Sequence, residues 1–224
     1  MAAPPNRLTT ASVAPEDLTA EIRGLLTAIE AGLSSDAFRE HLQQRTRQAT
    51  QIAIFSQALA DHESETPLKK YAADMRDAAL ALTKSLTPED TTAQVAIIRN
   101  ALAGKSSGTA PREMDWSHLA KASAMMGAMK ERSEAVRRGL RRPRDPDVES
   151  RHALAIALMS LVVHGDTHAV KNPDDQPLWQ ETSLELHRHL SRAAASIKSR
   201  DPSAADHFRL GMEACDKCHE KFKP

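Results

Sequence analysis

The last stretch of the chain brings together two cysteines and a histidine in the pattern Cys-x-x-Cys-His. These residues are Cys215, Cys218 and His219, and the chain of 224 residues contains no other cysteine. Two thiols at this spacing can each add to one vinyl group of a porphyrin, and the adjacent histidine can donate a ring nitrogen to its iron. The motif therefore predicts one covalently attached haem c, with Cys215 and Cys218 as the thioether residues and His219 as the proximal iron ligand.

Two other interpretations of the cysteine pair stay open at this point. The pair could be exposed and without function, or it could be a thioredoxin-like redox pair, although that motif accompanies a βαβ unit and the sequence shows no strand pattern. Two cysteines are too few for a disulfide network or a four-cysteine zinc site. We expect no enzyme activity, because no acid–base constellation accompanies the motif.

The composition favours helices and argues against several functional classes. Lys plus Arg equals Asp plus Glu at 30 each, so the formal net charge is zero, whereas a nucleic-acid-binding protein normally carries a basic surface. Aromatic residues make up 3% of the chain and glycines number eight, which is typical of helical proteins. No apolar run approaches the roughly 20 residues of a membrane span. We therefore expect an all-α protein without nucleic-acid partners or membrane spans.

The N-terminal residues bear on the location of the protein. Residues 1–6 do not form a basic segment followed by an apolar one, so they do not have the pattern of a secretory signal. Haem is attached to Cys-x-x-Cys-His motifs outside the cytoplasm. We therefore expect a periplasmic or other extracytoplasmic location, with a signal peptide that has been removed.

Apolar residues recur at helical spacing and divide the chain into eight amphipathic helices in two sets of four. We expect a disordered N-terminus at residues 1–14, a haem-free four-helix bundle at 15–105, a linker at 106–113 and a haem-binding four-helix bundle at 114–224. Capping residues and prolines predict several of the helix starts. These starts are Ser34-Ser35-Asp36, Thr87-Pro88, Asp145-Pro146 and Asp201-Pro202.

Short sequence matches relate the two sets of helices. Residues 84–88 align with 198–202, and an extension without gaps puts 101–105 opposite the motif at 215–219. This indicates an internal duplication whose first copy lacks haem ligands. The alternative, that any two amphipathic four-helix bundles align this well, stays open.

From residue 114 to 224 the chain resembles the class II c-type cytochromes, the cytochrome c′ and c556 group, which are four-helix bundles. The resemblance rests on the motif's position in the last helix, followed by an aromatic residue at Phe222 and a base at Lys223. The family commonly has arginine in place of Lys223, and residues 15–105 resemble it only through the repeat. The resemblance implies two tandem cytochrome c′-like bundles, of which the C-terminal one carries the haem.

The resemblance also implies that the first helix of the haem-binding bundle supplies the distal side of the iron. We expect this helix at residues 116–140, and matching 136–139 to the end of the family's first helix places the distal position at Ser123. In c556-like members a methionine there is the sixth ligand, whereas in c′-like members an apolar residue blocks the site.

Residues at helical spacing around Ser123 define the expected distal pocket. Met126 lies one turn further along the same face and is the candidate sixth ligand. Trp116 and Leu119 share this face, so we expect them to line the pocket with Ser123. Met125 and Met129 are expected to point elsewhere and to pack in the core. An open or apolar-blocked iron remains the alternative to ligation by Met126.

Three functions follow from these expectations. The first is electron transfer with a redox partner protein, which a methionine ligand favours because it raises the haem potential. The second is binding of NO or CO at a five-coordinate iron. In the third, residues 15–105 dock a partner, or pair as a homodimer or as a pseudo-dimer within the chain, because bundles of this family often pair through their first two helices.

Two further groups of polar residues have simpler explanations. Five arginines between positions 137 and 144 are expected to form a solvated turn, with a docking patch for an acidic redox partner or a contact with a haem propionate as alternatives. These arginines are Arg137, Arg138, Arg141, Arg142 and Arg144.

His164 and His168 are four residues apart, as in some metal sites, but Gly165 between them indicates a helix end.

Overall fold

The computed structural model describes residues 13–33, 38–108 and 112–222. Within these ranges the regular structure consists of eight α-helices and short 3-10 turns, without strands. No helix there is long and apolar enough to cross a membrane. The expected all-α class is confirmed, as the low content of aromatic residues and glycine indicates.

The helices follow one another through short connections. The first four, with the 3-10 turn η2 before the third, are α1 (Pro15–Leu33), α2 (Leu42–Ala60), η2 (Lys69–Tyr71), α3 (Ala72–Leu82) and α4 (Pro88–Leu102). The remaining elements are η3 (Trp116–His118), α5 (Ala122–Arg141), α6 (Pro146–Gly165), η4 (Pro173–Asp175), α7 (Gln176–Ser199) and α8 (Ala204–Phe222).

Capping side chains explain where several helices begin. The Thr87 hydroxyl and the Asp145 and Asp201 carboxylates each accept a hydrogen bond from a backbone N–H two or three residues later. Such bonds satisfy donors that the first turn of a helix leaves free. The predicted starts near these three residues are therefore confirmed, although α8 begins only at Ala204. The cap expected at residues 34–36 lies outside the described residues, and α2 begins at Leu42.

The expected helix at residues 116–140 is wrong at its start. Trp116–His118 forms the separate turn η3, and α5 begins only at Ala122. Lys121 has an extended backbone, with a φ of −79° and a ψ of 141°. The buried Asp166 carboxylate accepts a hydrogen bond from the Ala122 N–H at 2.7 Å. This long-range cap starts the helix at Ala122, so residues before it do not share the helical spacing of α5.

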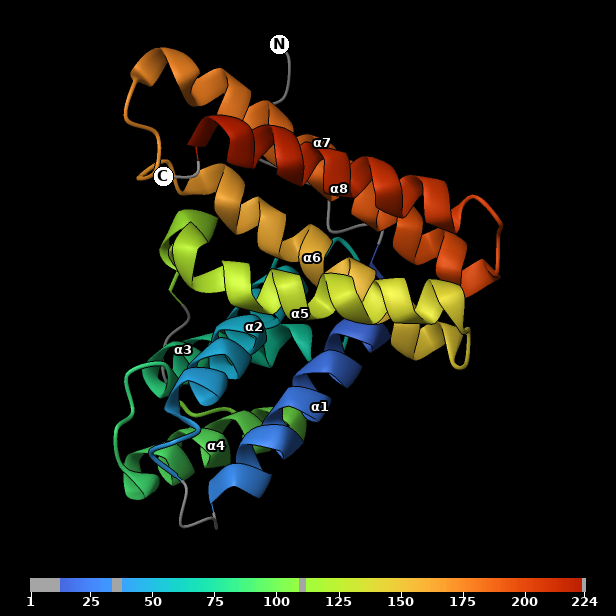
Figure 1. The fold of residues 1–224 in the computed structure, drawn as a ribbon. Helices are drawn as coiled ribbons and strands as arrows, with labels where there is room; N and C mark the ends of the chain where they lie inside the picture. Colours follow the sequence, from blue (N-terminus) through green and yellow to red (C-terminus); the bar gives the residue numbers. More distant parts are fainter. Residues whose placement is uncertain (1–12, 34–37, 109–111, 223–224) are drawn as a thin grey trace.

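Neighbouring helices pack in chain order around a continuous hydrophobic core. In the first set α1 contacts α2 and α4, and α3 packs between α2 and α4; in the second set α5, α6, α7 and α8 contact one another in succession. Helix α2 also contacts α5 and α6. Figure 1 shows α1–α4 on one side of the molecule and α7 and α8 on the other, with α5 and α6 between them. The two sets share one apolar core rather than being tethered loosely.

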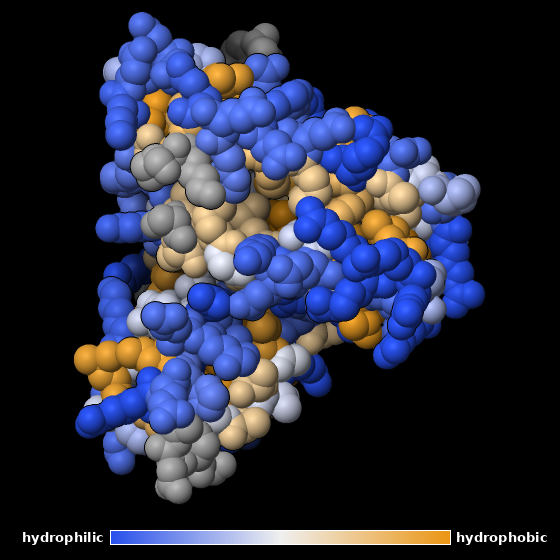
Figure 2. Space-filling view, viewed as in Figure 1, coloured by the Kyte–Doolittle hydropathy of each residue, from blue (hydrophilic) through white to orange (hydrophobic). Residues whose placement is uncertain are grey.

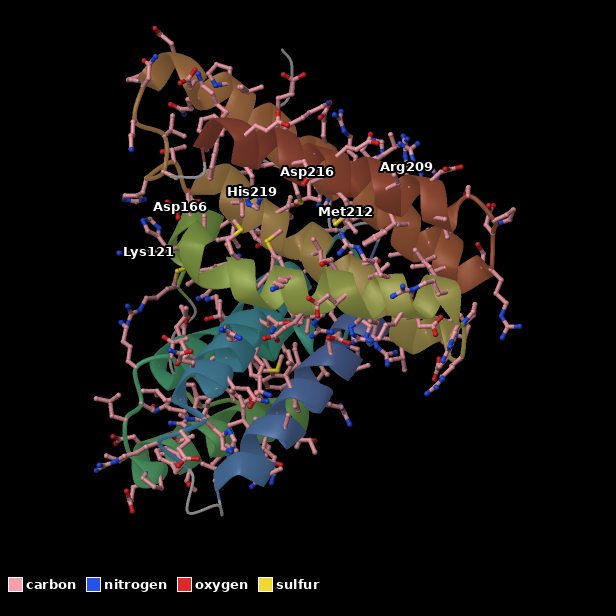
Figure 3. All side chains as sticks on the ribbon, viewed as in Figure 1. Lys121, Asp166, Arg209, Met212, Asp216 and His219 are labelled. Carbon is pink, nitrogen blue, oxygen red and sulfur yellow. The ribbon has the colours of Figure 1, made fainter. Side chains whose placement is uncertain are left out.

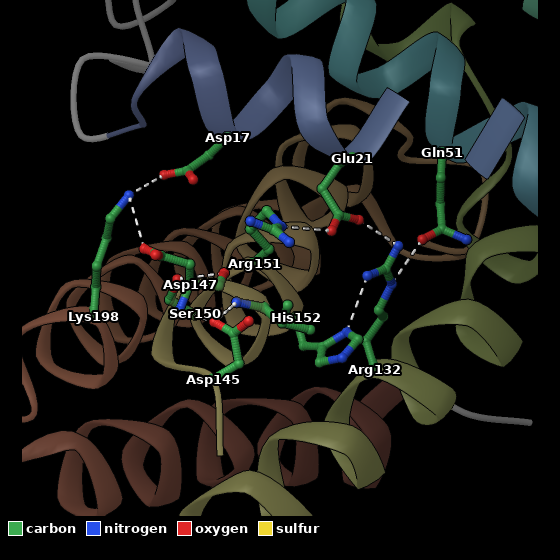
Figure 4. A network of polar contacts seen from close by, with 11 residues as sticks. Asp17, Glu21, Gln51, Arg132, Asp145, Asp147, Ser150, Arg151, His152 and Lys198 are labelled. Atoms are coloured by element: carbon green, nitrogen blue, oxygen red, sulfur yellow. Dashed lines mark hydrogen bonds and ion pairs between the residues drawn. The ribbon is translucent and has the colours of Figure 1, made fainter. Parts of the chain in front are cut away.

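A largely buried ion-pair network joins the two sets of helices. Glu21 of α1 pairs with Arg132 of α5 at 2.7 Å and with Arg151 of α6 at 3.3 Å, and its side chain is 12% exposed. Arg132 also donates hydrogen bonds to Gln51 of α2 and to His152 of α6 (Figure 4). Removing the partner of a buried charge lowers the free energy of unfolding strongly. The network therefore fixes how α1 and α2 sit on α5 and α6.

The described part of the expected linker at 106–113 is anchored on α3. The Asp74 carboxylate accepts hydrogen bonds from Ser106 and Ser107. Arg76, one of the most deeply buried side chains, donates to the Arg112 carbonyl at 2.8 Å. Both sides of this connection are therefore held against the first set of helices.

Candidate functional site

The three motif residues lie together on one side of α8. Cys215, Cys218 and His219 are at positions i, i+3 and i+4 of this helix, which places them on one face. All three line a cavity of about 440 Å³ that α8 shares with α5, α6 and α7. Figure 3 shows His219 and Met212 on the side of α8 that faces α5. The structure therefore brings the motif to a cavity within the second set of helices.

The cavity is mainly apolar, and each of the four helices contributes to its wall. Figure 2 shows apolar atoms gathered in the hollow between the polar surfaces of α5 and α8. Besides the motif, its lining residues are Met126, Met129, Lys130, Ser133 and Arg137 of α5, Ile156 and Val163 of α6, Thr182, Ser183 and Leu186 of α7, and Met212, Ala214 and Asp216 of α8.

Helix α8 packs closely on α7 beside this cavity. A Cβ atom on Gly211 would lie 1.9 Å from the Cδ2 atom of Leu190, so only glycine allows α8 to pack this closely on α7. Across the cavity, α5 contacts α8 through a long side chain: the Arg137 guanidinium lies 5.9 Å from the centre of the Phe208 ring. The packing thus holds the motif helix firmly on one side only.

Burial controls the chemistry of the two thiols. Burial, together with the nearby Cys218 and Asp216, raises the pKa of Cys215 to about 12. Burial also raises the pKa of Cys218, although a hydrogen bond with Thr182 opposes this. Reactive redox cysteines need a lowered pKa, because the thiolate is the nucleophile. These thiols are therefore protonated at neutral pH, which argues against the thioredoxin-like interpretation.

His219 is exposed at the edge of the cavity, one helical turn beyond Cys215. Within the described ranges, no group of three or more His, Cys, Asp and Glu side chains is arranged to hold a metal ion. A porphyrin brings four nitrogen ligands to its iron, so His219 alone can complete one axial position.

The methionines of α5 divide between the cavity and the core. Met126 lines the cavity, and so does Met129. Met129 packs in the core as expected, with 8% of its surface exposed. The expectation that it points away from the face of Met126 is wrong, because three residues along a helix leave two side chains only about 60° apart. Met125 packs in the core with 1% of its surface exposed, as expected. Two thioethers of α5 therefore face the motif helix, rather than one.

The other residues expected in the distal pocket have different surroundings. Trp116 and Leu119 are not among the residues that line the cavity. The Trp116 ring N–H donates to the Asp61 carboxylate at 2.9 Å, and Leu119 is buried in the core. Both precede the start of α5, which removes them from the face that carries Met126. Ser123 lies in the first turn of α5, but its side chain is outside what the structure describes.

The residues around the cavity are compatible with a covalently held haem. Cofactor pockets are typically about 300–1,000 Å³ and mostly apolar, with a few placed polar groups. The thiols lie on one wall, and Lys130 and Arg137 on the facing helix offer positive charge for the two propionates of a porphyrin. Arg137 is thereby separated from the other arginines of its cluster, which do not line this cavity.

Part of the cavity wall was not predicted from the sequence. Thr182, Ser183 and Leu186 of α7 carry no local signal, because their role depends on the rotation of α7 about its own axis. Met212 is one turn before Cys215 on α8, so the helical spacing from the motif could have identified it.

Two other histidines of the second set of helices have partners within the protein. The ring Nδ1 of His187 lies 2.8 Å from the Ala157 carbonyl oxygen, and the His187 side chain is buried. Helix α6 ends at Gly165, between His164 and His168, as expected. His168 bonds to Asp166 instead, so this pair is not on one helix face.

Comparisons of the chain with protein-family models, with curated proteins and with solved structures found no match.

Proposed function

We propose that the chain is a monohaem c-type cytochrome of the class II kind that acts in extracytoplasmic electron transfer with a redox partner protein. One observation carries the proposal: the complete Cys-x-x-Cys-His motif lines an apolar cavity of about 440 Å³. The protonated thiols also suit the addition of an S–H group across a vinyl group.

Each part of the cavity has a role in this proposal. Cys215 and Cys218 hold the haem through thioether bonds, and His219 donates a ring nitrogen to the iron. The bound haem supplies one-electron chemistry. Ile156 and Leu186 exclude water from the cavity, while Lys130 and Arg137 offset the charge of the propionates. Burial of this kind tunes the potential together with the axial ligand.

Met126 is the candidate sixth ligand in this proposal, and Met129 is the competing one. Both thioethers lie on α5, across the cavity from the motif. A methionine ligand raises the haem potential and favours electron transfer over binding of external ligands.

Binding of NO or CO is the second candidate function. Methionine is a flexible side chain that fills apolar space, so Met126 and Met129 can pack in the cavity without binding iron. A five-coordinate iron in this apolar cavity would admit small neutral molecules and exclude anions.

We further propose that α1–α4 form a haem-free bundle that pairs with α5–α8 as a pseudo-dimer within the chain. Lys105 aligns with His219, but α4 ends at Leu102 and Gly104 adopts a φ of 77°, so no helical residue corresponds to the proximal ligand. The contacts of α2 with α5 and α6 and the ion pairs of Glu21 support the pairing. In this arrangement the first bundle supports α5, the helix that lies across the cavity from the motif.

Optical spectra of the exported protein, oxidised and dithionite-reduced, with and without CO, test the two functions. Electron transfer predicts a low-spin reduced spectrum with sharp α and β bands that CO does not change. A broad high-spin spectrum that shifts on addition of CO would contradict methionine ligation and make gas binding the leading function.

A further inference from the structure

A second cavity lies where the end of α5 meets the start of α6, apart from the candidate haem cavity. Its volume is about 550 Å³. The adjacent residues Arg137 and Arg138 line different cavities. Arg137 lines the candidate haem cavity, and Arg138 lines this second one. The charged and titratable side chains in its wall are Arg138, Arg141, Arg142, Arg144, Glu149 and His152.

The four arginines of this cavity are exposed and form no ion pair in the described structure, although Arg141 donates a hydrogen bond to the Arg137 carbonyl at 3.2 Å. Arg132 and Arg151 pair with Glu21, and Arg47 pairs with Glu131. Among the residues that the structure describes, no carboxylate lies within 4.0 Å of the guanidinium nitrogens in the cavity wall. Because the whole chain is formally neutral, this is a local excess of positive charge.

The single carboxylate in the wall is already engaged. One oxygen of Glu149 accepts a hydrogen bond from the Arg144 backbone N–H at 2.8 Å. The Glu149 side chain is also packed on the backbone of Gly139, where a Cβ atom would lie 2.9 Å from the Glu149 Cδ. Glu149 therefore shapes the cavity floor and orders its loop, and it forms no ion pair with the arginines.

His152 adds a neutral donor to the same wall. Its Nδ1 lies 3.0 Å from an Arg132 guanidinium nitrogen, which can only donate, so the ring proton must be on Nε2. Burial, together with the positive charges of Arg132, Arg138 and Arg151, lowers the pKa of His152 to about 4, although the Glu149 carboxylate opposes this. At neutral pH the cavity wall thus presents four guanidinium groups and an imidazole N–H, with almost no free acceptor.

We propose that this cavity binds a small multivalent oxyanion, with a phosphate or pyrophosphate group as the fitting class. An anion of this kind consists of acceptors, which complement the donors of the cavity wall, and guanidinium groups match phosphate oxygens with paired N–H donors. Four positive charges exceed what a single carboxylate group neutralises. The concave shape, with half-buried His152 in its wall, favours a small molecule over the broad acidic surface of a protein.

Calorimetric titration of the haem-loaded full chain with inorganic pyrophosphate tests the proposal. We expect saturable 1:1 binding that persists at about 0.15 M salt, where exposed charges are largely screened. Arg138→Gln and Arg142→Gln should each weaken binding about tenfold, the effect of losing one charge-assisted hydrogen bond. The double variant Arg188→Gln/Arg192→Gln removes two exposed arginines of α7 and should bind like the wild type.

The ring NMR signals of His152 give a second readout at the site. Saturation with pyrophosphate should raise the pKa of His152, because the anion offsets the arginine charges that lower it. Binding that is absent, that the α7 double variant also loses, or that leaves the titration of His152 unchanged would overturn the proposal. So would binding of an acidic peptide to these arginines without binding of pyrophosphate. The same titration on protein purified without haem keeps this test separate from the proposed cytochrome function.

Discussion

Met126 of α5 and His219 of α8 line the same cavity from two different helices. This relationship leads to a prediction about ligation. Met126→Ala should convert a low-spin haem into a high-spin one that binds CO, because the thioether that occupies the sixth position is lost. Optical spectra with and without CO measure the change.

Met129→Ala is the matched control for this change, because Met129 also lies on α5 and lines the cavity. It should leave the low-spin spectrum intact. If Met129→Ala opens the site and Met126→Ala does not, the sixth ligand is Met129. If neither variant changes the spectrum, ligation by these methionines is excluded.

Gly211 allows α8 to lie close to α7, and this contact gives a stability prediction. Gly211→Ala should lower the free energy of unfolding by about 1–3 kcal/mol, the usual cost of overpacking a core. The new Cβ would lie 1.9 Å from Leu190, which is itself fully buried and cannot easily move. Urea unfolding followed by circular dichroism measures the change.

Gly24→Ala provides the comparison, since Gly24 is in α1 and a Cβ there would meet nothing within 4 Å. Alanine has the higher helix propensity, so this variant should gain up to about 1 kcal/mol. Equal effects of the two substitutions would mean that α7 and α8 do not pack as described.

The network around Glu21 predicts that the two sets of helices unfold together. Glu21→Gln removes the charge that pairs with Arg132 and Arg151 and leaves two largely buried guanidinium groups without a carboxylate. We expect a loss of about 1–3 kcal/mol, the cost of an unsatisfied buried group. Denaturant unfolding, monitored separately by haem absorbance and by circular dichroism, measures both the loss and any separation into two transitions.

Glu134→Gln is the control, because Glu134 is exposed on α5 and forms no ion pair in the described structure. Its unfolding curve should match that of the wild type. A Glu21→Gln curve that also matches the wild type would show that the network does not hold α1 to α5 and α6.

His152 predicts a dependence of stability on pH. Its pKa falls from 6.5 to about 4 in the folded protein through burial and the neighbouring arginines. Between these two values the unfolded chain binds a proton that the folded protein does not, so stability falls as the pH drops from about 6.5 toward about 4. Urea midpoints measured across this range should therefore fall more steeply for the wild type than for His152→Gln. Parallel pH profiles of the two proteins would contradict this assignment.

Local patterns in the sequence predicted much of the fold. Periodic apolar residues marked the helices, and Thr87, Asp145 and Asp201 marked three helix starts because capping depends on residues within one turn. The motif itself identified Cys215, Cys218 and His219 as residues on one helix face, since their spacing is that of a helical turn.

Features set by contacts between distant residues were not predictable in the same way. The start of α5 depends on Asp166, which is far along the chain from Ala122. Because of this shift, Trp116 and Leu119 do not lie in the expected distal pocket. Met129 lines the cavity because the side of α5 that faces the cavity is wide enough to include it as well as Met126. The contribution of α7 to the cavity depends on how closely Gly211 lets α8 approach, which no local pattern encodes.

Covalent attachment of haem is the central claim, and intact-mass spectrometry of the denatured protein tests it most directly. The chain is exported with a supplied signal sequence in a host that matures c-type cytochromes. We predict that the denatured chain carries the added mass of one haem, that Cys215→Ala/Cys218→Ala carries none, and that Met125→Leu, a conservative change in the core, carries the same haem as the wild type. A wild-type chain that is exported and folded but carries no covalent haem would contradict the claim.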